Sequence, residues 1–440
     1  MNCQKFFELA KSKGITQSQI QVFKSSSIGI KLFHHEVDNY KVSSSQSLVA
    51  CGIYEGKFGY GRTEKLGKGA FEFLTEQIIL TAKYSEKKNT IGLFEGSPKY
   101  KKRNVFNKEL SSMPIEKKLA LLKEFEDEIY KADKRVSDAD GVSYSERETS
   151  SEFYNSFGLK LSQKNNFATI VGGAVARENN ETKTYYDVYF GNDISKFNPK
   201  EFAQSIVKKT ISKFNGEPCV SGKYPTVLDK SIVSDLITYF LQSTIADEVQ
   251  RHSSFLEGKL NEKVASSKLT IEEKPLAKNV FFSYFDDEGV ATQNKVIIKN
   301  GVLKSYFYNR ETAFKDGTVS TGNGVWEGSK IGTDFGNIFV KPGRQSFDEL
   351  ISPIKEGVYI TEIAGLGTGM NANSGNFSCQ AEGYMIRNGK IEEPLNLITI
   401  SGNLLTLFKD LKGFSNRNEL DSSSISVGDA YIKKLSIGGK

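Results

Sequence analysis

The sequence predicts an α+β protein, with strands and helices in its N-terminal part and a β-rich, largely antiparallel C-terminal part. Strand patterns occupy residues 19–63 and 153–190, and helical periodicity recurs in separate blocks around them. Late in the chain two Asn-Gly turns lie between short strand-like runs. Because 440 residues exceed what one hydrophobic core usually supports, we expect two domains.

Residues 4–12 have the pattern of a short amphipathic helix that stops at Gly14. The strand region that follows contains a hairpin signal at Glu55-Gly56. Apolar residues then recur with helical spacing over 69–84, after Pro114, and over 198–214. The turn-forming stretch 215–218 comes next, so we expect domains of residues 1–216 and 217–440.

The C-terminal part opens with a predicted helix over residues 231–249. Short strands follow, and both Asn300-Gly301 and Asn388-Gly389 predict two-residue hairpin turns. This arrangement predicts antiparallel pairing in the second half of the chain.

Composition excludes several classes of protein. The net charge of +6 is small and dispersed, and we interpret the densest basic cluster, residues 99–103, as a solvated loop. Nucleic-acid binding is therefore not expected. No apolar run approaches the roughly 18 residues needed to span a bilayer, and charged residues interrupt the N-terminus, so we expect a cytoplasmic protein without a membrane segment. The four scattered cysteines predict reduced thiols.

The first candidate for chemistry is the stretch from Asp247 to His252, which has the spacing of an HExxxH metal motif with aspartate in the first position. In such a motif Glu248 would be the general base, and Asp247 and His252 would be metal ligands. On a continuous helix these two ligands lie about 140° apart, from 3.6 residues per turn, so the helix would have to distort or end between them. An exposed, polar helix end is the alternative interpretation.

Three other stretches have both a chemical and a structural interpretation. The glycine run 365–371 lacks the following helix of a phosphate loop and favours a turn. His34-His35 could bind a metal at a strand end, or form a solvated hairpin edge. Asp286-Asp287-Glu288 could hold a hard cation, but a turn between strands explains it equally well.

From residue 221 to 415 the chain resembles the TldD/PmbA family of metallopeptidases, also called modulators of DNA gyrase. The resemblance rests on whole phrases, in order along the chain: GKYPTVLD at 222–229, SSFL at 253–256, LTIEE at 269–273, FDDEGV at 285–290, NGVL at 300–303, STGN at 320–323, SGNFS at 374–378, EGY at 382–384 and ISGNL at 400–404. These sequence motifs resemble the PmbA, or TldE, branch of the family more closely than the TldD branch.

The resemblance implies where a zinc site would be. TldD-type subunits carry HExxxH on a helix and a cysteine near the C-terminus, whereas TldE-type subunits lack these ligands and pair with a TldD subunit. In this chain the corresponding helix segment is Ile237 to Gln242, which has no ligand, and the segment Phe414 to Val427 has Ser422, Ser423 and Ser424 but no cysteine.

Three hypotheses follow. The first is a non-catalytic TldE-like subunit that binds no cofactor itself and pairs with a TldD-like catalytic subunit carrying zinc, or forms a homodimer, to act on unfolded or extended peptides. In this hypothesis the hairpins at Asn300-Gly301 and Asn388-Gly389 present strand edges to the peptide. The second is a metallopeptidase in its own right that uses Asp247, Glu248 and His252. The third is a protein that binds gyrase or nucleic acid.

Overall fold

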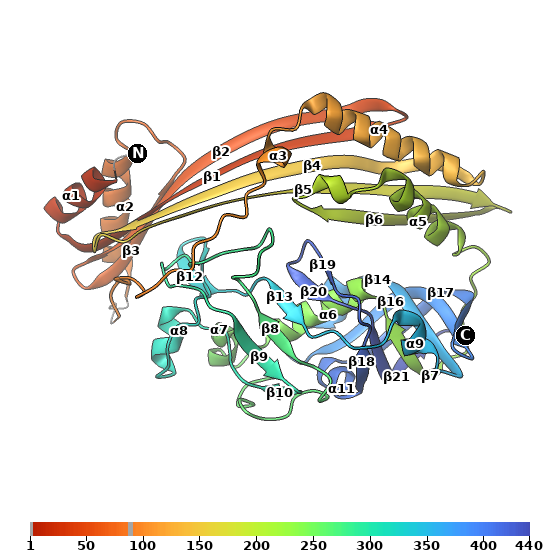
Figure 1. Ribbon diagram of the computed structural model, residues 1–440. Coiled ribbons are helices and arrows are strands. Elements are labelled where there is room, and N and C mark those ends of the chain that lie inside the picture. Colours follow the sequence, from red (N-terminus) through yellow and green to blue (C-terminus); the bar gives the residue numbers. More distant parts are fainter. Residues whose placement is uncertain (1–2, 87–90) are drawn as a thin grey trace.

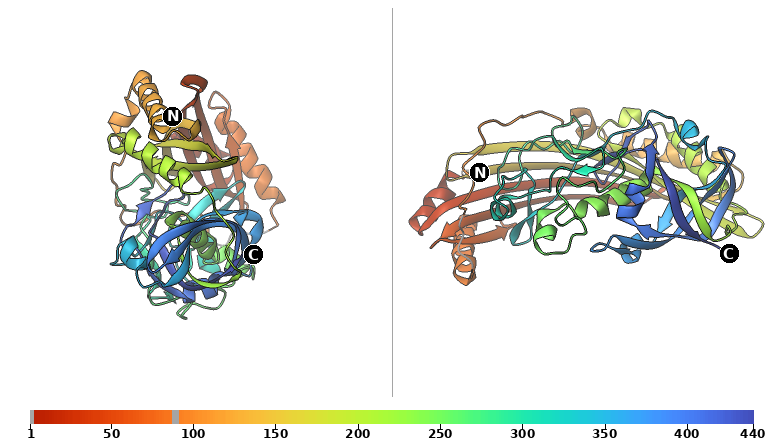
Figure 2. Two further views of the ribbon diagram at one scale, coloured as in Figure 1. Left: turned by 90° about the vertical axis from the view of Figure 1, so that its right-hand side faces the viewer. Right: turned by 90° about the horizontal axis from the view of Figure 1, so that it is seen from below.

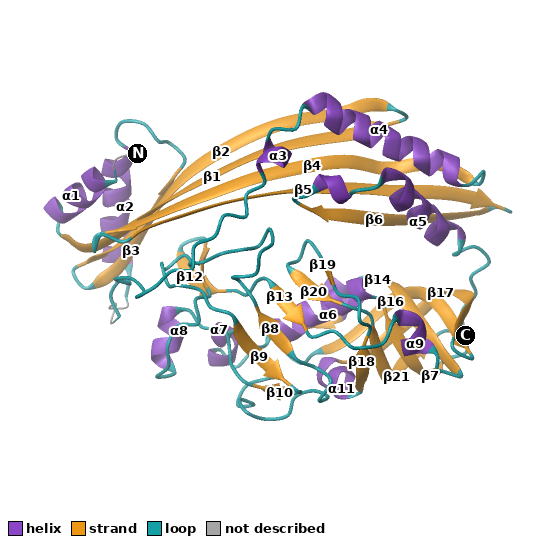
Figure 3. Cartoon of the chain, in the orientation of Figure 1, coloured by secondary structure: helices purple, strands orange, loops and turns teal. Residues whose placement is uncertain are grey.

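The computed structural model describes residues 3–86 and 91–440. It is an α+β fold, as the sequence predicts: a long antiparallel sheet arches over a second, β-rich region (Figures 1 and 3). We call residues 3–216 the arch and residues 217–440 the base.

The arch is a six-stranded antiparallel sheet in the order β3-β2-β1-β4-β5-β6. Two-residue turns with positive φ at both positions join three of the strand pairs, at His34-His35, Glu55-Gly56 and Asn179-Asn180. The strands are β1 (Ile15–Phe33), β2 (Glu36–Tyr54), β3 (Lys57–Thr63), β4 (Val136–Asn155), β5 (Lys160–Glu178) and β6 (Glu181–Gly191).

One strand of the arch begins much earlier than the sequence pattern indicates. β4 starts at Val136, whereas the pattern predicts strands only from Phe153. Its first part buries only Ala139, Val142, Tyr144 and Glu146, and one of these four is a glutamate. A hydrophobic period of two is therefore hidden in the sequence.

Helices cover the arch at both ends. At one end α1 (Gln4–Ser12) and α2 (Ala70–Tyr84) share a core with β1 and β2, and at the other α4 (Ile115–Ala132) and α5 (Pro199–Ile211) pack on the face turned away from the base (Figure 1). A Cβ atom at Gly172 of β5 would lie 2.4 Å from the Phe125 ring, so glycine there lets α4 approach the sheet. The short helices are α3 (Lys108–Ser111) and a 3₁₀ turn at Ile194–Lys196.

The base contains a closed barrel, visible end-on in Figure 2. It closes because β14 pairs with β7 on one side and with β16 on the other. Its strands are β7 (Gly222–Leu228), β21 (Ala430–Gly438), β17 (Lys390–Asn403), β16 (Asn376–Arg387) and β14 (Glu356–Ala364), with β15 (Met370–Asn371) on β16 and β18 (Leu411–Phe414) on β21.

A second sheet of the base has the order β10-β9-β8-β13-β20-β19. Both Asn-Gly hairpins predicted from the sequence are confirmed, at β9–β10 and β16–β17. The strands are β8 (Ile271–Glu273), β9 (Lys295–Lys299), β10 (Val302–Leu303), β13 (Ile338–Val340), β19 (Glu419–Leu420) and β20 (Ile425–Val427), beside a separate hairpin of β11 (Gly324–Glu327) and β12 (Lys330–Thr333).

The predicted helix over residues 231–249 is wrong in one respect, because it is broken in two. The Phe307 N–H donates to the Thr244 carbonyl (2.9 Å) and the Ala246 N–H to the Phe307 carbonyl (3.0 Å), and this main-chain pairing interrupts the helix. The helices of the base are α6 (Lys230–Gln242), α7 (Ala246–Gln250), α8 (Arg310–Lys315), α9 (Phe347–Ile351), α10 (Leu366–Gly369) and α11 (Leu404–Lys409).

Aromatic packing joins the arch to the base. Phe153 and Leu161 of the arch share a core with Phe282 and Phe285 of the base. The Tyr284 hydroxyl bonds to the main chain of Ser162 on β5. The two regions are thus held in a fixed arrangement, in which the segment 276–290 lies against the sheet.

All four cysteines are buried and none is in a disulfide. Among residues 3–86 and 91–440, no helix is long and apolar enough to cross a membrane.

Candidate functional site

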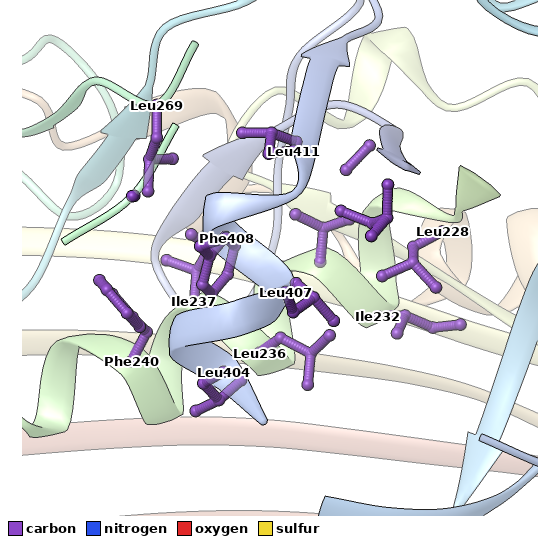
Figure 4. Close-up of a cluster of buried hydrophobic side chains, with 14 of the residues drawn as sticks. Leu228, Ile232, Leu236, Ile237, Phe240, Leu269, Leu404, Leu407, Phe408 and Leu411 are labelled. Carbon is purple, nitrogen blue, oxygen red and sulfur yellow. The ribbon is translucent and has the colours of Figure 1, made fainter. Parts of the chain in front are cut away.

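The segment Ile237 to Gln242, where the resemblance places a metal-binding helix, is the last part of α6. Ile237, Phe240 and Leu241 are fully buried. Figure 4 shows Ile237 and Phe240 in the core between α6 and α11, and the Phe240 ring packs edge-on against Phe408 at 4.8 Å. This part of α6 therefore serves packing, and no ligand side chain is available on it.

The C-terminal segment that the resemblance pairs with this helix does lie beside it. The turn between β19 and β20 contains the three serines 422–424, and Asp421 in that turn accepts a hydrogen bond from the Ser234 hydroxyl of α6. Burial raises the pKa of Asp235, and the charge of Asp421 acts in the same direction. The two segments therefore lie side by side in this chain, joined by the bond between Ser234 and Asp421.

The three residues of the HExxxH-like stretch do not converge. Glu248 pairs with Arg251 at the end of α7. His252 adopts a left-handed backbone (φ 59°), its side chain is 80% exposed, and its Nδ1 lies 2.6 Å from Glu257. Asp247 instead faces a cavity. Within residues 3–86 and 91–440, no three His, Cys, Asp or Glu side chains are grouped to hold a metal ion.

The cavity that Asp247 lines has a volume of about 1080 Å³ and lies between the end of the arch and the base. Its lining comes from five places in the sequence: β1 to β3, residues 85 and 91–94, α7, the turn 286–289, and α8 with β12. The lining includes Cys51, Phe58, Phe94, Asp247, Arg251, Asp287, Glu288, Arg310, Glu311, Phe314, Lys315, Asp316 and Lys330.

The turn Asp286-Asp287-Glu288 forms one wall of this cavity, and two of its carboxylates are used to build it. Asp286 accepts from the N–H groups of Glu288 (3.0 Å), Val290 (2.9 Å) and Gly324 (2.9 Å). Asp287 accepts from the Trp326 N–H (2.9 Å) and from Gln21 of β1 (3.2 Å). The turn interpretation of this stretch therefore holds for Asp286 and Asp287.

Glu288 is different, because it reaches the cavity with bonding capacity to spare. Its Oε2 accepts from the Arg310 N–H at the start of α8 (2.8 Å). Burial raises its pKa to about 7, and the charges of Glu311 and Asp287 act in the same direction, against Arg310. Glu288 can thus gain or lose a proton near neutral pH.

The cations of the lining are already engaged. Arg310 donates to the carbonyls of Gly92 (2.9 Å) and Ile91 (3.2 Å). The other three pair with carboxylates, two of which lie outside the lining: Arg251 with Glu248, Lys330 with Glu327, and Lys315 with Glu311.

Asp247 has no such partner. Its Oδ2 is buried without a hydrogen bond, and none of the described residues donates to its carboxylate. Leaving a buried acceptor unsatisfied costs about 1–3 kcal/mol. Among the described lining cations, Arg310 alone has no carboxylate partner, and its charge acts on Glu288. The lining carboxylates of Asp247, Asp287, Glu288 and Asp316 outnumber it, so the cavity retains negative charge.

The remaining sequence candidates are structural. His34 and His35 form the β1–β2 turn, where His35 Nδ1 lies 3.2 Å from Asp127 of α4. The glycine run continues β14 into one helical turn, α10, and then β15, so the predicted turn contains a short helix. Residues 99–103 lie in an extended segment, in which Lys102 and Arg103 line a smaller cavity against the arch.

The strand edges predicted to hold a peptide are largely occupied by the chain itself. The Leu303 N–H donates to the Glu262 carbonyl (3.0 Å), and the Asn261 N–H to the Leu303 carbonyl (2.8 Å), so residues 261–265 cover β10. β16 lies between β14 and β17. The hairpin prediction is right, but the proposed use of these edges is wrong, because loops that no local pattern places there pair with the β10 edge.

Sequence reasoning missed the cavity itself. It selected Asp247 and Glu288 for separate reasons, but not Arg310 or the aromatic residues Phe58, Phe94 and Phe314. No local pattern marks these, because they meet only when the arch folds against the base.

Comparisons with known proteins agree with this fold. Two sequence profiles match: the PmbA/TldA metallopeptidase central domain over residues 108–214 and the C-terminal domain over 221–439. The Metalloprotease PmbA homolog of Haemophilus influenzae is 24% identical over 98% of this chain and 94% of its own length. A protein of Methanothermobacter thermautotrophicus named Metalloprotease is 32% identical over 68% of this chain and 69% of its own.

Solved structures give the same result. A proposed modulator of a DNA gyrase from Thermotoga maritima is 27% identical with a TM-score of 0.91, covering 99% of both chains. TldE from Thermococcus kodakarensis also has a TM-score of 0.91 over 99% of both chains; at 21% identity it supports the fold alone. From the matching profiles, the relatives and the shared architecture, this chain is a member of the PmbA/TldD metallopeptidase family and is PmbA-like.

Proposed function

We propose that this chain is a non-catalytic, TldE-like subunit of a cytoplasmic, zinc-dependent peptidase that acts on unfolded or extended peptides. One observation carries the proposal: the part of α6 where the family's zinc ligands would be is buried in the core, with Ile237, Phe240 and Leu241 fully enclosed. The zinc belongs to a TldD-like partner subunit.

An open edge of the arch supports pairing with a partner subunit. β3 pairs only with residues 48–54 of β2, and the exposed remainder, residues 36–45, pairs with β1 on its other side alone. Val37, Tyr40 and Val42 face the same side, because they lie opposite Leu32, Ile30 and Ile28 of β1. They are 45%, 55% and 61% exposed. A long, exposed apolar edge favours pairing with another chain.

Co-expression tests this proposal. The chain is produced alone and together with an HExxxH-bearing TldD-like chain, and hydrolysis of an unfolded casein substrate is measured. We expect a stable complex, with hydrolysis only by the complex. Hydrolysis by the chain alone, abolished by Glu248→Gln, would support the self-sufficient enzyme. A homodimer with no affinity for the TldD-like chain would contradict the proposed pairing with a TldD-like subunit.

A further inference from the structure

The lining of the cavity between the arch and the base includes none of residues 237–242 of α6, where the family resemblance places a metal site. The cavity has room for a ligand, since binding cavities commonly span about 300–1,000 Å³, and its volume is about 1080 Å³. Its walls combine uncompensated carboxylate groups with aromatic surface, so they select for chemistry of a particular kind.

The charge of the walls favours a cationic ligand. Asp247 has a buried oxygen with no hydrogen-bond donor. Glu288 uses one oxygen for the Arg310 N–H, and no donor from the described residues bonds to the other. Arg251 and Lys330 are neutralised by Glu248 and Glu327, outside the lining. Arg310 bonds to neutral carbonyls and offsets part of the charge of Glu288, but Asp247, Asp287 and Asp316 also line the cavity. A positively charged ligand would offset this negative charge and could donate to the Glu288 oxygen that has no donor from the described residues.

The arrangement suits an organic cation better than a metal ion. A hard metal ion needs several oxygen ligands around one point. Here the described side chains form no group of three possible ligands, and Phe58, Phe94 and Phe314 contribute apolar surface between the charged groups. A primary ammonium group needs only a few acceptors, because it has three N–H donors, and the apolar walls suit the chain that carries it.

We propose that this cavity binds a primary ammonium group carried by a short apolar peptide segment, with Asp247 and Glu288 as its counter-charges. The peptide carrier rests on the proposed function, whereas the ammonium site rests on the cavity alone. A peptide N-terminus and a lysine side chain share this chemistry. Either would be held away from the barrel core, so the site would anchor a chain and not cut it.

Direct binding to the purified, full-length chain tests the proposal without any partner or hydrolysis. Calorimetry at pH 7.5 compares three peptide amides: Phe-Leu-Ala with a free N-terminus, the same peptide N-acetylated, and N-acetyl-Phe-Leu-Lys. We expect measurable affinity for the free N-terminus, for the lysine peptide, or for both, and at least tenfold weaker binding of the acetylated peptide without lysine. Equal binding of all three, or of none, would overturn the proposal.

Variants locate the site. Asp247→Asn and Glu288→Gln should each weaken binding of the preferred peptide at least tenfold. Glu262→Gln is the control, because Glu262 is an exposed glutamate that pairs with Lys259, and neither residue lines the cavity. It should leave binding within twofold of the unmodified chain. Unchanged binding in both Asp247→Asn and Glu288→Gln would overturn the proposal, while the question of a zinc-bearing partner would stay separate.

Discussion

The Tyr284 hydroxyl makes two hydrogen bonds with the main chain of Ser162: it donates to the carbonyl oxygen at 2.6 Å and accepts from the N–H at 2.9 Å. Tyr284 belongs to the base and is 2% exposed, and Ser162 is on β5 of the arch. A single side chain therefore satisfies both main-chain groups of a residue in the other region, beside the aromatic cluster that joins the two.

Removing this hydroxyl should weaken the junction. Tyr284→Phe leaves both Ser162 groups without their partner, so we expect a loss of about 1–3 kcal/mol in the free energy of unfolding. Urea denaturation measures it. Tyr84→Phe is the control, because Tyr84 is 82% exposed and should change stability by less than about 0.5 kcal/mol. Equal effects of the two changes would refute the role of this contact.

A buried ion pair between α4 and β4 gives a second prediction. Lys118 Nζ lies 2.6 Å from Glu146, and the two side chains are 2% and 4% exposed. Lys118→Met leaves Glu146 buried without its counter-charge, so we expect a loss of about 3–5 kcal/mol. The exposed neighbour Lys117 provides the control, and Lys117→Met should be close to neutral. A loss below about 1 kcal/mol for Lys118→Met would contradict the prediction.

The raised pKa of Glu288 predicts that the stability of the chain depends on pH. Its pKa is raised from 4.5 to about 7, chiefly by burial, with Asp287 and Glu311 acting in the same direction against Arg310; Asp286 and Cys51 are also close to it. The folded state thus holds this proton more tightly than the unfolded chain. The resulting stability is fully present below about pH 4.5 and is lost as the pH rises through about 7.

Denaturation of Glu288→Gln at several pH values checks this. Relative to the unmodified chain, the variant should gain about 2–3 kcal/mol between pH 5 and pH 8, because it lacks the titrating group. Glu262→Gln is the control, since Glu262 is an exposed glutamate outside the cavity lining. A difference between Glu288→Gln and the unmodified chain that does not vary with pH would show that Glu288 titrates normally.

The open edge of β2 predicts where the partner subunit binds. Val42→Lys places a charge on this apolar strip and should weaken association with a TldD-like chain at least tenfold, as measured by surface plasmon resonance. Val220 is 65% exposed and Val42 61%, so Val220→Lys is a matched control that should have no effect. If both variants bind as the unmodified chain does, the partner contacts another surface.

Local patterns predicted much of the fold. The helices α1, α2, α4 and α5 and the hairpin turns at Glu55-Gly56, Asn300-Gly301 and Asn388-Gly389 follow the expected residues closely. The break between α6 and α7 was not predictable, because it depends on main-chain pairing with Phe307, a residue far along the chain. The same holds for the start of β4, where apolar residues are few and one of the buried positions is Glu146, which conceals the strand pattern.

The candidate site was predicted only in fragments. Asp247 and Glu288 stood out because each belongs to a conspicuous acidic stretch. Glu248 and His252, which were expected to act together with Asp247, point elsewhere. The cavity depends on how the arch meets the base, and the sequence has no local signal for that contact. The residue types at 237–242, in contrast, can be read from the sequence alone, and whether the chain binds zinc stays a prediction.

Metal analysis tests the central claim most directly, namely that this chain is the non-catalytic subunit. The chain is purified alone and in complex with an HExxxH-bearing TldD-like chain, and its zinc content is measured by mass spectrometry after dialysis. We predict well below one zinc per chain for the chain alone and one zinc per heterodimer for the complex. One tightly bound zinc in the chain alone, with peptide hydrolysis that Glu248→Gln abolishes, would contradict the claim.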